Sequence, residues 1–176
     1  MRVIAGTARG IRLSTPKGND IRPTSDRTRE AVFNSLHSRS AIEDAEVLDL
    51  FAGTGALGIE ALSRGAKKAT FVDNSSESLD LVKENLKKSG FISKAEIVKG
   101  ESLEWLQKCS SSWDLVLLDP PYSFENWPEL LNTLSQKQIG TVVIESNREI
   151  DPGVKWNVDS MRQYGSSVVE VINPEG

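Results

Sequence analysis

The sequence contains one cysteine and one histidine among its 176 residues. A single cysteine cannot form a disulfide within the chain, and Cys109 with His37 supplies too few ligands for a structural metal. No apolar run approaches the ~18 residues of a membrane span. The basic N-terminal segment lacks the apolar core of a signal peptide. We therefore expect a cytoplasmic protein that holds no metal.

The chain also lacks an overall excess of positive charge, since its net charge is −4. The charge is uneven, however. Residues 1–40 contain eight Lys and Arg against three acids, a net charge of +5, which leaves −9 for the other 136 residues. Seven of those eight cations are arginine, whose planar fork suits phosphate. A basic arm on an acidic body indicates a polyanionic partner, although a solvated, salt-bridged surface has the same composition.

Strand and helix patterns alternate along most of the chain. Its length and 38% hydrophobic content suit a single soluble domain over residues 1–176, with a basic hairpin and helix extension over residues 1–40. Thr24 or Ser25 can cap the helix of that extension. Strands are predicted at 2–5, 11–13, 46–51, 69–73, 95–99, 114–118, 141–145, 155–158 and 167–172, and later helices at 56–64, 76–88, 103–108 and 127–136. Repeated strand–helix units predict an α/β fold with a doubly wound, mostly parallel, seven-stranded sheet of Rossmann-like type.

A glycine-rich loop joins the first of the alternating strands to its helix, in the segment LDLFAGTGALGIEAL. Glycine at positions 53, 55 and 58 lets the backbone turn tightly and approach a ligand at a helix N-terminus. Asp73 ends the next strand, twenty residues after Gly53. A carboxylate there can accept both ribose hydroxyls of an adenosine. This spacing predicts a nucleoside cofactor.

The acids around this loop indicate which nucleoside cofactor binds. Asp49 lies four residues before Gly53 and is expected to point into the same mouth. A carboxylate is a poor neighbour for a pyrophosphate and a good one for a sulfonium and an ammonium group. Glu101, after the third strand, adds an acid where an adenine amine could be recognised. We therefore favour S-adenosylmethionine over NAD, with S-adenosylhomocysteine as the product.

The fourth strand ends in the rigid corner Asp119-Pro120-Pro121-Tyr122. Proline fixes its own φ and restricts the residue before it. The corner therefore presents a carboxylate, backbone carbonyls and an aromatic ring, unless it merely terminates the strand. Ligands of doubly wound sheets bind at the carboxyl ends of the strands, where the strand order reverses. If the first and fourth strands flank that point, this corner faces the glycine loop across the cofactor.

Such a corner suits an exocyclic base amine, whose lone pair is delocalised into the ring. Hydrogen bonds from the amine to the Asp119 carboxylate and the Pro120 carbonyl would orient it and raise its electron density. They would also stabilise the positive charge that develops as a methyl group arrives. Tyr122 could stack on a base that is flipped out of its helix. The structural alternative for Tyr122 and Phe124 is packing against the following helix.

Several segments together resemble the bacterial small-subunit (16S) ribosomal RNA guanine-N2 methyltransferases, over nearly the whole chain. The matching segments are RVIAGTARGIRL, IRPTSDRTREAVFNSL, DLFAGTGALGIEALSRGA, LLDPPY and the late Tyr164-Gly165. The resemblance implies a class I S-adenosylmethionine-dependent methyltransferase that modifies the N2 amine of a guanine in ribosomal RNA. The RNA would be free or part of a partly assembled small subunit, and the enzyme is expected to be a monomer.

The resemblance also implies roles for residues in three groups. The first group binds the cofactor and comprises Asp49, Phe51, Ala52, Gly53, Thr54, Gly55, Gly58, Asp73, Asn74, Glu101 and Ser102. The second group, Asp119, Pro120, Pro121 and Tyr122, presents the target amine. The third group approaches RNA phosphate and comprises Arg9, Arg12, Arg22, Arg27 and Arg29, unless Arg27 and Glu30 brace the cofactor pocket. Glu101-Ser102 departs from the family, which more often has a shorter Asp or Asn there, sometimes followed by Ala.

Three alternatives remain open from the sequence. The same corner would serve another amino-methyltransferase, acting on adenine N6 of a nucleic acid or on a protein glutamine amide. A non-catalytic nucleoside-binding module is less consistent with the intact Asp119 and glycines. An NAD-dependent oxidoreductase predicts neither an amine-receiving corner nor a carboxylate at Asp49.

Overall fold

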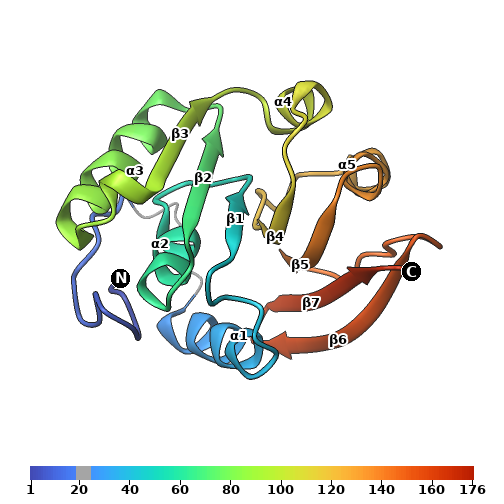
Figure 1. Cartoon of the computed structure of the whole chain (residues 1–176), viewed down its shortest axis with the longest axis horizontal. Helices are drawn as coiled ribbons and strands as arrows, with labels where there is room; N and C mark the ends of the chain where they lie inside the picture. Colours follow the sequence, from blue (N-terminus) through green and yellow to red (C-terminus); the bar gives the residue numbers. More distant parts are fainter. Residues whose placement is uncertain (19–24) are drawn as a thin grey trace.

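A computed structural model describes residues 1–18 and 25–176, and in that part of the chain seven strands form one sheet (Figure 1). The strand order is β3-β2-β1-β4-β5-β7-β6. Strands β1 to β5 pair in parallel, whereas β7 runs antiparallel to both β5 and β6. The strands are β1 (Glu46–Asp49), β2 (Lys68–Asp73), β3 (Ala95–Lys99), β4 (Trp113–Leu118), β5 (Ile139–Ser146), β6 (Trp156–Tyr164) and β7 (Ser167–Pro174). The prediction of a mostly parallel, doubly wound sheet is confirmed.

Helices cover both faces of this sheet, as the arrangement in Figure 1 shows. One hydrophobic core contains side chains of α1, α2 and α3, and a second contains side chains of α4 and α5. Ser25, one of the two expected caps, accepts from the Thr28 N–H at the start of α1. The helices are α1 (Asp26–Ser38), α2 (Ala56–Ser63), α3 (Ser76–Ser89), α4 (Ser102–Lys108) and α5 (Trp127–Ser135), with a short 3-10 helix η1 (Ile92–Lys94).

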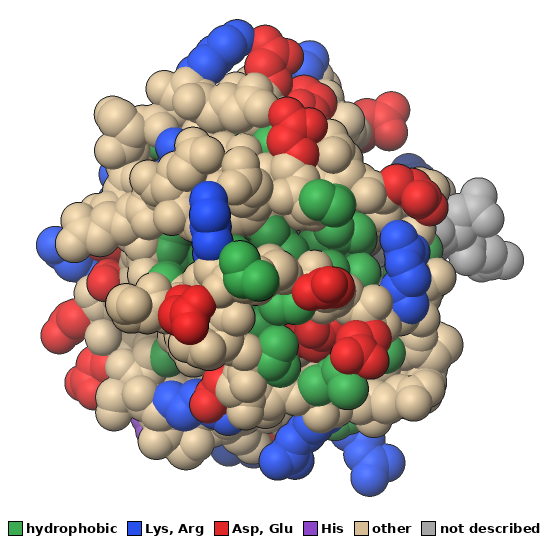
Figure 2. Space-filling view, turned by 90° about the vertical axis from the view of Figure 1, so that its right-hand side faces the viewer, with side chains coloured by type: hydrophobic (Ala, Val, Ile, Leu, Met, Phe, Trp, Pro, Cys, Tyr) green, Lys and Arg blue, Asp and Glu red, His purple; other side chains and the backbone are tan. Residues whose placement is uncertain are grey.

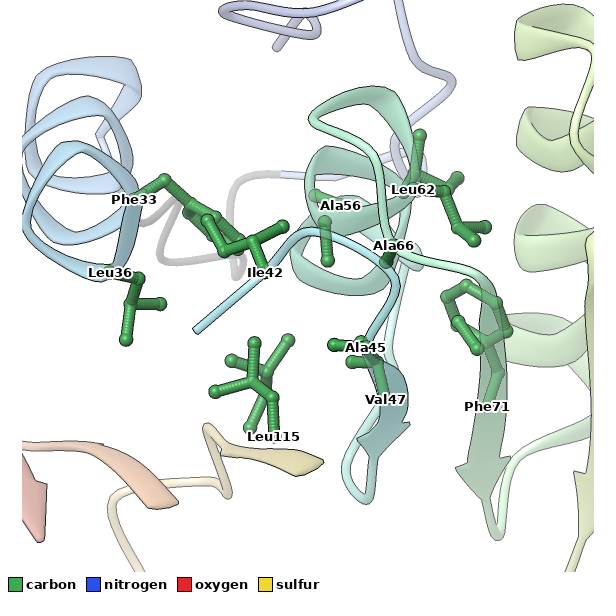
Figure 3. Close-up of a cluster of buried hydrophobic side chains, with 14 of the residues drawn as sticks. Phe33, Leu36, Ile42, Ala45, Val47, Ala56, Leu62, Ala66, Phe71 and Leu115 are labelled. Atoms are coloured by element: carbon green, nitrogen blue, oxygen red, sulfur yellow. The ribbon is translucent and has the colours of Figure 1, made fainter. Parts of the chain in front are cut away.

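The core beneath α1 and α2 fixes the elements that flank the glycine loop (Figure 3). Phe33 of α1, Val47 of β1, Phe71 of β2 and Leu115 of β4 are each at most 1% exposed. Burying a side chain of this size contributes about 1.5–3 kcal/mol. The start of α2 is thereby held against the ends of β1 and β2.

The final hairpin is longer than the sequence predicts. β6 and β7 contain nine and eight residues, whereas strands at 155–158 and 167–172 were expected. β6 is the edge strand and most of its residues are exposed, so it lacks the alternation of apolar and polar side chains that reveals a half-buried strand. Its pairing with β7 continues to Tyr164 despite an irregularity between Val158 and Ser160.

The N-terminal arm, residues 1–18, contains the expected hairpin but not two regular strands. A single antiparallel bridge joins Arg2 and Arg12. The arm is anchored on α2, because the fully buried Glu60 carboxylate accepts the N–H groups of Ile4 (2.9 Å) and Ala5 (3.1 Å). The basic hairpin therefore lies against the helix that begins at the glycine loop.

Charges of both signs are mixed on the face that carries α5 and the β6–β7 hairpin (Figure 2). Hydrophobic side chains gather near the centre of that face, with acidic side chains among them. This face is a poor electrostatic match for a polyanion. Within residues 1–18 and 25–176, no helix combines the length and the apolar character needed to cross a bilayer.

Candidate active site

The carboxyl ends of β1 and β4 meet at the point where the strand order reverses. These two strands pair in register from Val47 with Leu115 to Asp49 with Leu117. The glycine loop follows β1 and the Asp119 corner follows β4, so Gly53 and Asp119 line the same cavity of about 250 Å³. They also line a neighbouring cavity of about 920 Å³. The strand order thus places the corner opposite the glycine loop, as the sequence suggested.

The larger cavity is strongly acidic. Four carboxylate residues line it, and no Lys or Arg is among its described lining residues. Those acids are Asp73, Glu101, Asp119 and Glu125. A pyrophosphate would be repelled by this lining, whereas a ligand with a sulfonium and an ammonium group would be attracted.

The glycine loop presents bare backbone to these cavities and packs closely beneath them. Gly53 has a φ of +56°, and a Cβ built on it would meet nothing within 4 Å. Gly58 is at the opposite extreme, because its Cβ would lie 2.4 Å from Cε1 of Phe71 and 3.2 Å from Oδ2 of Asp49. Gly58 therefore allows α2 to lie directly on the sheet.

We expect Gly58→Ala to separate α2 from β1 and β2 and so to distort the loop above them. The melting temperature should fall by about 5 °C or more, and binding of S-adenosylhomocysteine, followed by isothermal titration, should weaken. Gly100→Ala, directly after β3, is a control with the same substitution, since its Cβ would make only an ordinary contact, 3.5 Å from Trp105. Equal behaviour of the two variants would contradict the packing role given to Gly58.

Asp49 lies beneath the glycine loop and not in its mouth, which corrects the expected orientation of its side chain. The residue is 1% exposed, and its Oδ2 accepts the Gly58 N–H at 3.0 Å. Its Oδ1 has no hydrogen-bond partner within the part of the chain that the structure describes. Burial raises the pKa of Asp49 from 3.8 to about 8. This carboxyl group is therefore poised to ionise when a cation arrives nearby.

The raised pKa of Asp49 makes stability depend on pH. Between pH 3.8 and about 8 the folded chain holds a proton here that the unfolded chain has lost, so the free energy of unfolding falls as the pH rises through this window. We expect Asp49→Asn to remove this dependence. In denaturant titrations the wild type should lose on the order of 3 kcal/mol relative to the variant between pH 5 and pH 8. Parallel losses in the two proteins would show that Asp49 is not the group responsible.

Asp73 connects the glycine loop to the start of α3. Its Oδ2 accepts the Gly53 N–H and its Oδ1 accepts the Ser75 N–H, both at 2.9 Å. These bonds orient the carboxylate, and each oxygen keeps a lone pair for a further donor. Asp73 and Asn74 both line the larger cavity, where a ribose could be held.

Glu101 and Ser102 also line the larger cavity, and both make hydrogen bonds that hold α4 in place. The Glu101 carboxylate caps α4 by accepting the N–H groups of Leu103 (3.3 Å) and Glu104 (2.8 Å). The Ser102 hydroxyl donates to the carbonyl of Leu50 at 2.7 Å, which ties α4 to the end of β1. If Glu101 recognises an adenine, the same carboxylate would have to cap α4 and bind the adenine amine.

The Asp119 corner has both packed and accessible parts. Pro120 is buried, Asp119 and Tyr122 are half-buried, and Pro121 is exposed. The Phe124 N–H donates to the Pro121 carbonyl at 2.8 Å, and the chain turns there. The ring of Phe124 packs edge-on between Phe51 (centroids 5.3 Å apart) and Trp127 (5.2 Å), so packing is its role. Tyr122 and Phe124 both line the larger cavity with Asp119.

The structure separates the five arginines expected at RNA. Arg9, Arg12 and Arg27 are exposed, and Arg22 lies outside the described residues. Arg29 is 1% exposed, and its Nη2 donates to the Arg2 carbonyl and to Oδ1 of Asp26, both at 2.7 Å. The prediction that Arg29 contacts RNA phosphate is therefore wrong, because its guanidinium is buried and joins the arm to α1.

Several lining residues escaped prediction because no sequence pattern marks them. Met1 and Pro16 of the arm line the smaller cavity, and Ser78 of α3 lines both cavities. Asn85 of α3 is fully buried, and its Nδ2 donates to the carbonyls of Ser14 (3.0 Å) and Thr54 (2.9 Å). It thereby joins the arm to the glycine loop, although a polar residue on an amphipathic helix is ordinarily expected to face solvent.

The residues present fit S-adenosylmethionine. Gly53 offers backbone without steric hindrance, and Asp73 offers an oriented carboxylate for the ribose. Beneath the loop, Asp49 holds a buried oxygen without a partner among the described residues. No group of three or more His, Cys, Asp or Glu suited to a metal ion occurs in residues 1–18 and 25–176.

Comparisons with known proteins agree with this geometry. The family described as Conserved hypothetical protein 95 matches residues 1–173. YlbH of Bacillus subtilis is 35% identical over 158 residues, which cover 86% of this chain and 85% of that protein. The Ribosomal RNA small subunit methyltransferase D of Haemophilus influenzae is 38% identical over 139 residues, 77% of this chain and 71% of that protein. The structure of yhhF from Escherichia coli superposes with a TM-score of 0.86 at 30% identity, covering 99% of this chain and 98% of that one.

The fold and site define an S-adenosylmethionine-dependent methyltransferase of the class I, Rossmann-like type. Within that class, the chain belongs to the Conserved hypothetical protein 95 family, whose match extends over residues 1–173.

Proposed function

We propose that this enzyme transfers a methyl group from S-adenosylmethionine to the exocyclic N2 amine of a guanine in small-subunit ribosomal RNA. The observation that carries the proposal is the shared cavity between Gly53 and Asp119, at the reversal of strand order. The Haemophilus influenzae relative is named a ribosomal RNA small subunit methyltransferase, which supports ribosomal RNA as the substrate. Guanine N2 as the target follows from the family resemblance and from the amine-receiving chemistry of the corner.

The protein's part in the reaction is to orient an amine and stabilise its developing charge. When bound, S-adenosylmethionine supplies an electrophilic methyl group. The Asp119 carboxylate and the Pro120 carbonyl would accept the two hydrogens of the amine, so that its lone pair points toward the glycine loop. Both acceptors also favour the positive charge that forms on nitrogen in the transition state. Alignment for in-line attack, with the reacting atoms ~3–3.5 Å apart, supplies much of the remaining gain.

The cofactor would be held by residues along the glycine loop and the larger cavity. The segment from Asp49 to Gly58 would hold the methionine half, with Asp49 acting from beneath the loop. Asp73 and Asn74 would bind the ribose, and Glu101 with Ser102 would lie at the adenine. The acidic lining of the cavity supports this orientation for a cationic donor.

The RNA would be held by the arm, which is anchored on α2. Arg9 and Arg12 of the arm and Arg27 of α1 are exposed and carry charge that phosphate can pair with. The expected setting is the cytoplasm, with a monomeric enzyme acting on free RNA or on a partly assembled subunit.

Incubation with methyl-labelled S-adenosylmethionine and unmodified small-subunit RNA tests this proposal, with 30S particles as a second substrate. Nucleoside mass spectrometry of the products should show N2-methylguanosine. N6-methyladenosine, or label found only in protein, would contradict the proposed target and favour a different amino-methyltransferase. Comparison of the two substrates shows which state of the RNA the enzyme accepts.

A further inference from the structure

The late Tyr164-Gly165 segment of the sequence forms the turn of the β6–β7 hairpin. Tyr164 pairs with Ser167, which leaves a two-residue turn, and Gly165 adopts a φ of +59° at its first position. This is the position that type II′ hairpin turns give to glycine. The turn makes Ser167 the first residue of β7.

The sheet register brings Ser167 to the same face as Glu145 of β5. Glu145 pairs with Val169, and side chains two residues apart on a strand share a face. Both residues are buried, Glu145 being 4% and Ser167 8% exposed. The Ser167 hydroxyl donates to Oε1 of Glu145 at 3.2 Å.

The Ser167 oxygen also reaches the Asp119 corner, because it lies 3.2 Å from the hydroxyl of Tyr122. A serine hydroxyl has one proton, and in this arrangement Ser167 gives it to Glu145. Tyr122 must then be the donor in its own bond. The three groups form a directed chain in which Tyr122 donates to Ser167 and Ser167 donates to Glu145.

From this hydrogen-bond chain we infer that Ser167 and Glu145 are positioning residues for Tyr122. The inference rests on the proposed function of the Asp119 corner. Holding the phenolic hydroxyl against the β6–β7 hairpin fixes where the far end of the ring lies at the cavity wall. A flipped base would then meet a ring already held in position, beside the carboxylate that binds its amine. Side chains that position a reactant raise the reaction rate, and misplacement of the reactant by about 1 Å can lower that rate by up to ~10²-fold.

The buried Glu145 end of this hydrogen-bond chain supports the role. Glu145 lines a small cavity together with Arg29 of α1, and that cavity also borders Val169 of β7. The carboxylate is therefore buried between a helix and the sheet, which limits how far it can move. Three separate elements, β5, β7 and the corner after β4, must keep their register for Tyr122 to keep its partner.

Tyrosine-selective spectroscopy can test for the hydrogen-bond chain without any methylation assay, since the protein has only two tyrosines. In protein labelled at tyrosine Cζ, the two NMR signals are assigned with Tyr164→Phe. Ser167→Ala should shift the Tyr122 signal, whereas Ser167→Thr, which keeps the hydroxyl, should restore it. Ser166→Ala is a matched control, because Ser166 is an exposed neighbour. An unmoved Tyr122 signal in Ser167→Ala would overturn the chain.

Steady-state kinetics then test whether the chain serves the reaction. Ser167→Ala and Tyr122→Phe should each lower kcat by about 10-fold or more, with S-adenosylhomocysteine affinity unchanged within about two-fold. The double variant should be no slower than the slower single variant, because both changes break one chain. If the two reductions in kcat multiply in the double variant, or if Ser167→Ala keeps full activity, the positioning role is overturned. A shifted NMR signal in an enzyme that does not methylate ribosomal RNA would instead refute the proposed function and leave the chain intact.

Discussion

Asp119→Ala should lower the rate of methyl transfer by about 10²- to 10³-fold or more while leaving cofactor affinity within a few-fold of wild type. The carboxylate is expected to bind the amine and stabilise its developing charge, and both effects are strongest in the transition state. In the proposed arrangement the cofactor contacts come mainly from the other wall of the cavity, which the glycine loop and Asp73 line. A tritium-transfer assay measures the rate, and isothermal titration with S-adenosylhomocysteine measures the affinity.

Asp80→Ala supplies a control for this experiment, because Asp80 is an exposed carboxylate on α3. It should leave both measurements at wild-type values. Asp119→Asn keeps one acceptor oxygen without the charge and should fall between the wild type and Asp119→Ala. Undiminished turnover in Asp119→Ala would remove this residue from the reaction.

Reversing the charge of the arm, in the double variant Arg9→Glu and Arg12→Glu, should weaken RNA binding by on the order of 10- to 100-fold at low salt. Both side chains are exposed on a hairpin anchored to α2. With each phosphate contact that is lost, binding releases fewer counterions. The slope of log affinity against log salt concentration should therefore become flatter by about 0.7 per contact on single-stranded RNA. Fluorescence anisotropy at several salt concentrations measures both quantities.

Lys87→Glu with Lys94→Glu matches this change in charge at a different place. These lysines are exposed near the end of α3 and in η1, which leads into the amino end of the edge strand β3, whereas the site lies at the carboxyl ends of the strands. This control should have little effect on affinity and on the salt slope. If instead it equals the arm variant, the RNA contact is non-specific, and an unchanged slope in the arm variant would place the contact elsewhere.

The sequence predicted which segments meet at the candidate site, because strand ends and loop chemistry are local properties. Gly53 and Asp73 have a spacing that follows from one strand–helix–strand unit, and the prolines after Asp119 fix a corner wherever the strand ends. The neighbouring positions of β1 and β4, which the sequence analysis had to assume, then bring Gly53 and Asp119 together. These predictions required only the periodicity of the chain and the rule that ligands bind where strand order reverses.

Burial of polar groups could not be predicted in the same way. Arg29 reads as one more cation of a basic arm, yet tertiary packing buries it against the Arg2 carbonyl and Asp26. Asp49 reads as an acid in the mouth, but the close approach of Gly58 places it beneath the loop. Ser167 belongs to a hairpin far along the chain from Tyr122, and only the sheet register makes them neighbours.

A crystal structure with S-adenosylhomocysteine bound tests the central claim most directly. The account predicts the ribose on Asp73 and the sulfur above Gly53, facing the Asp119 carboxylate over a gap that admits the edge of a purine. A sulfur turned away from Asp119, or a corner screened from the ligand by other side chains, would contradict it.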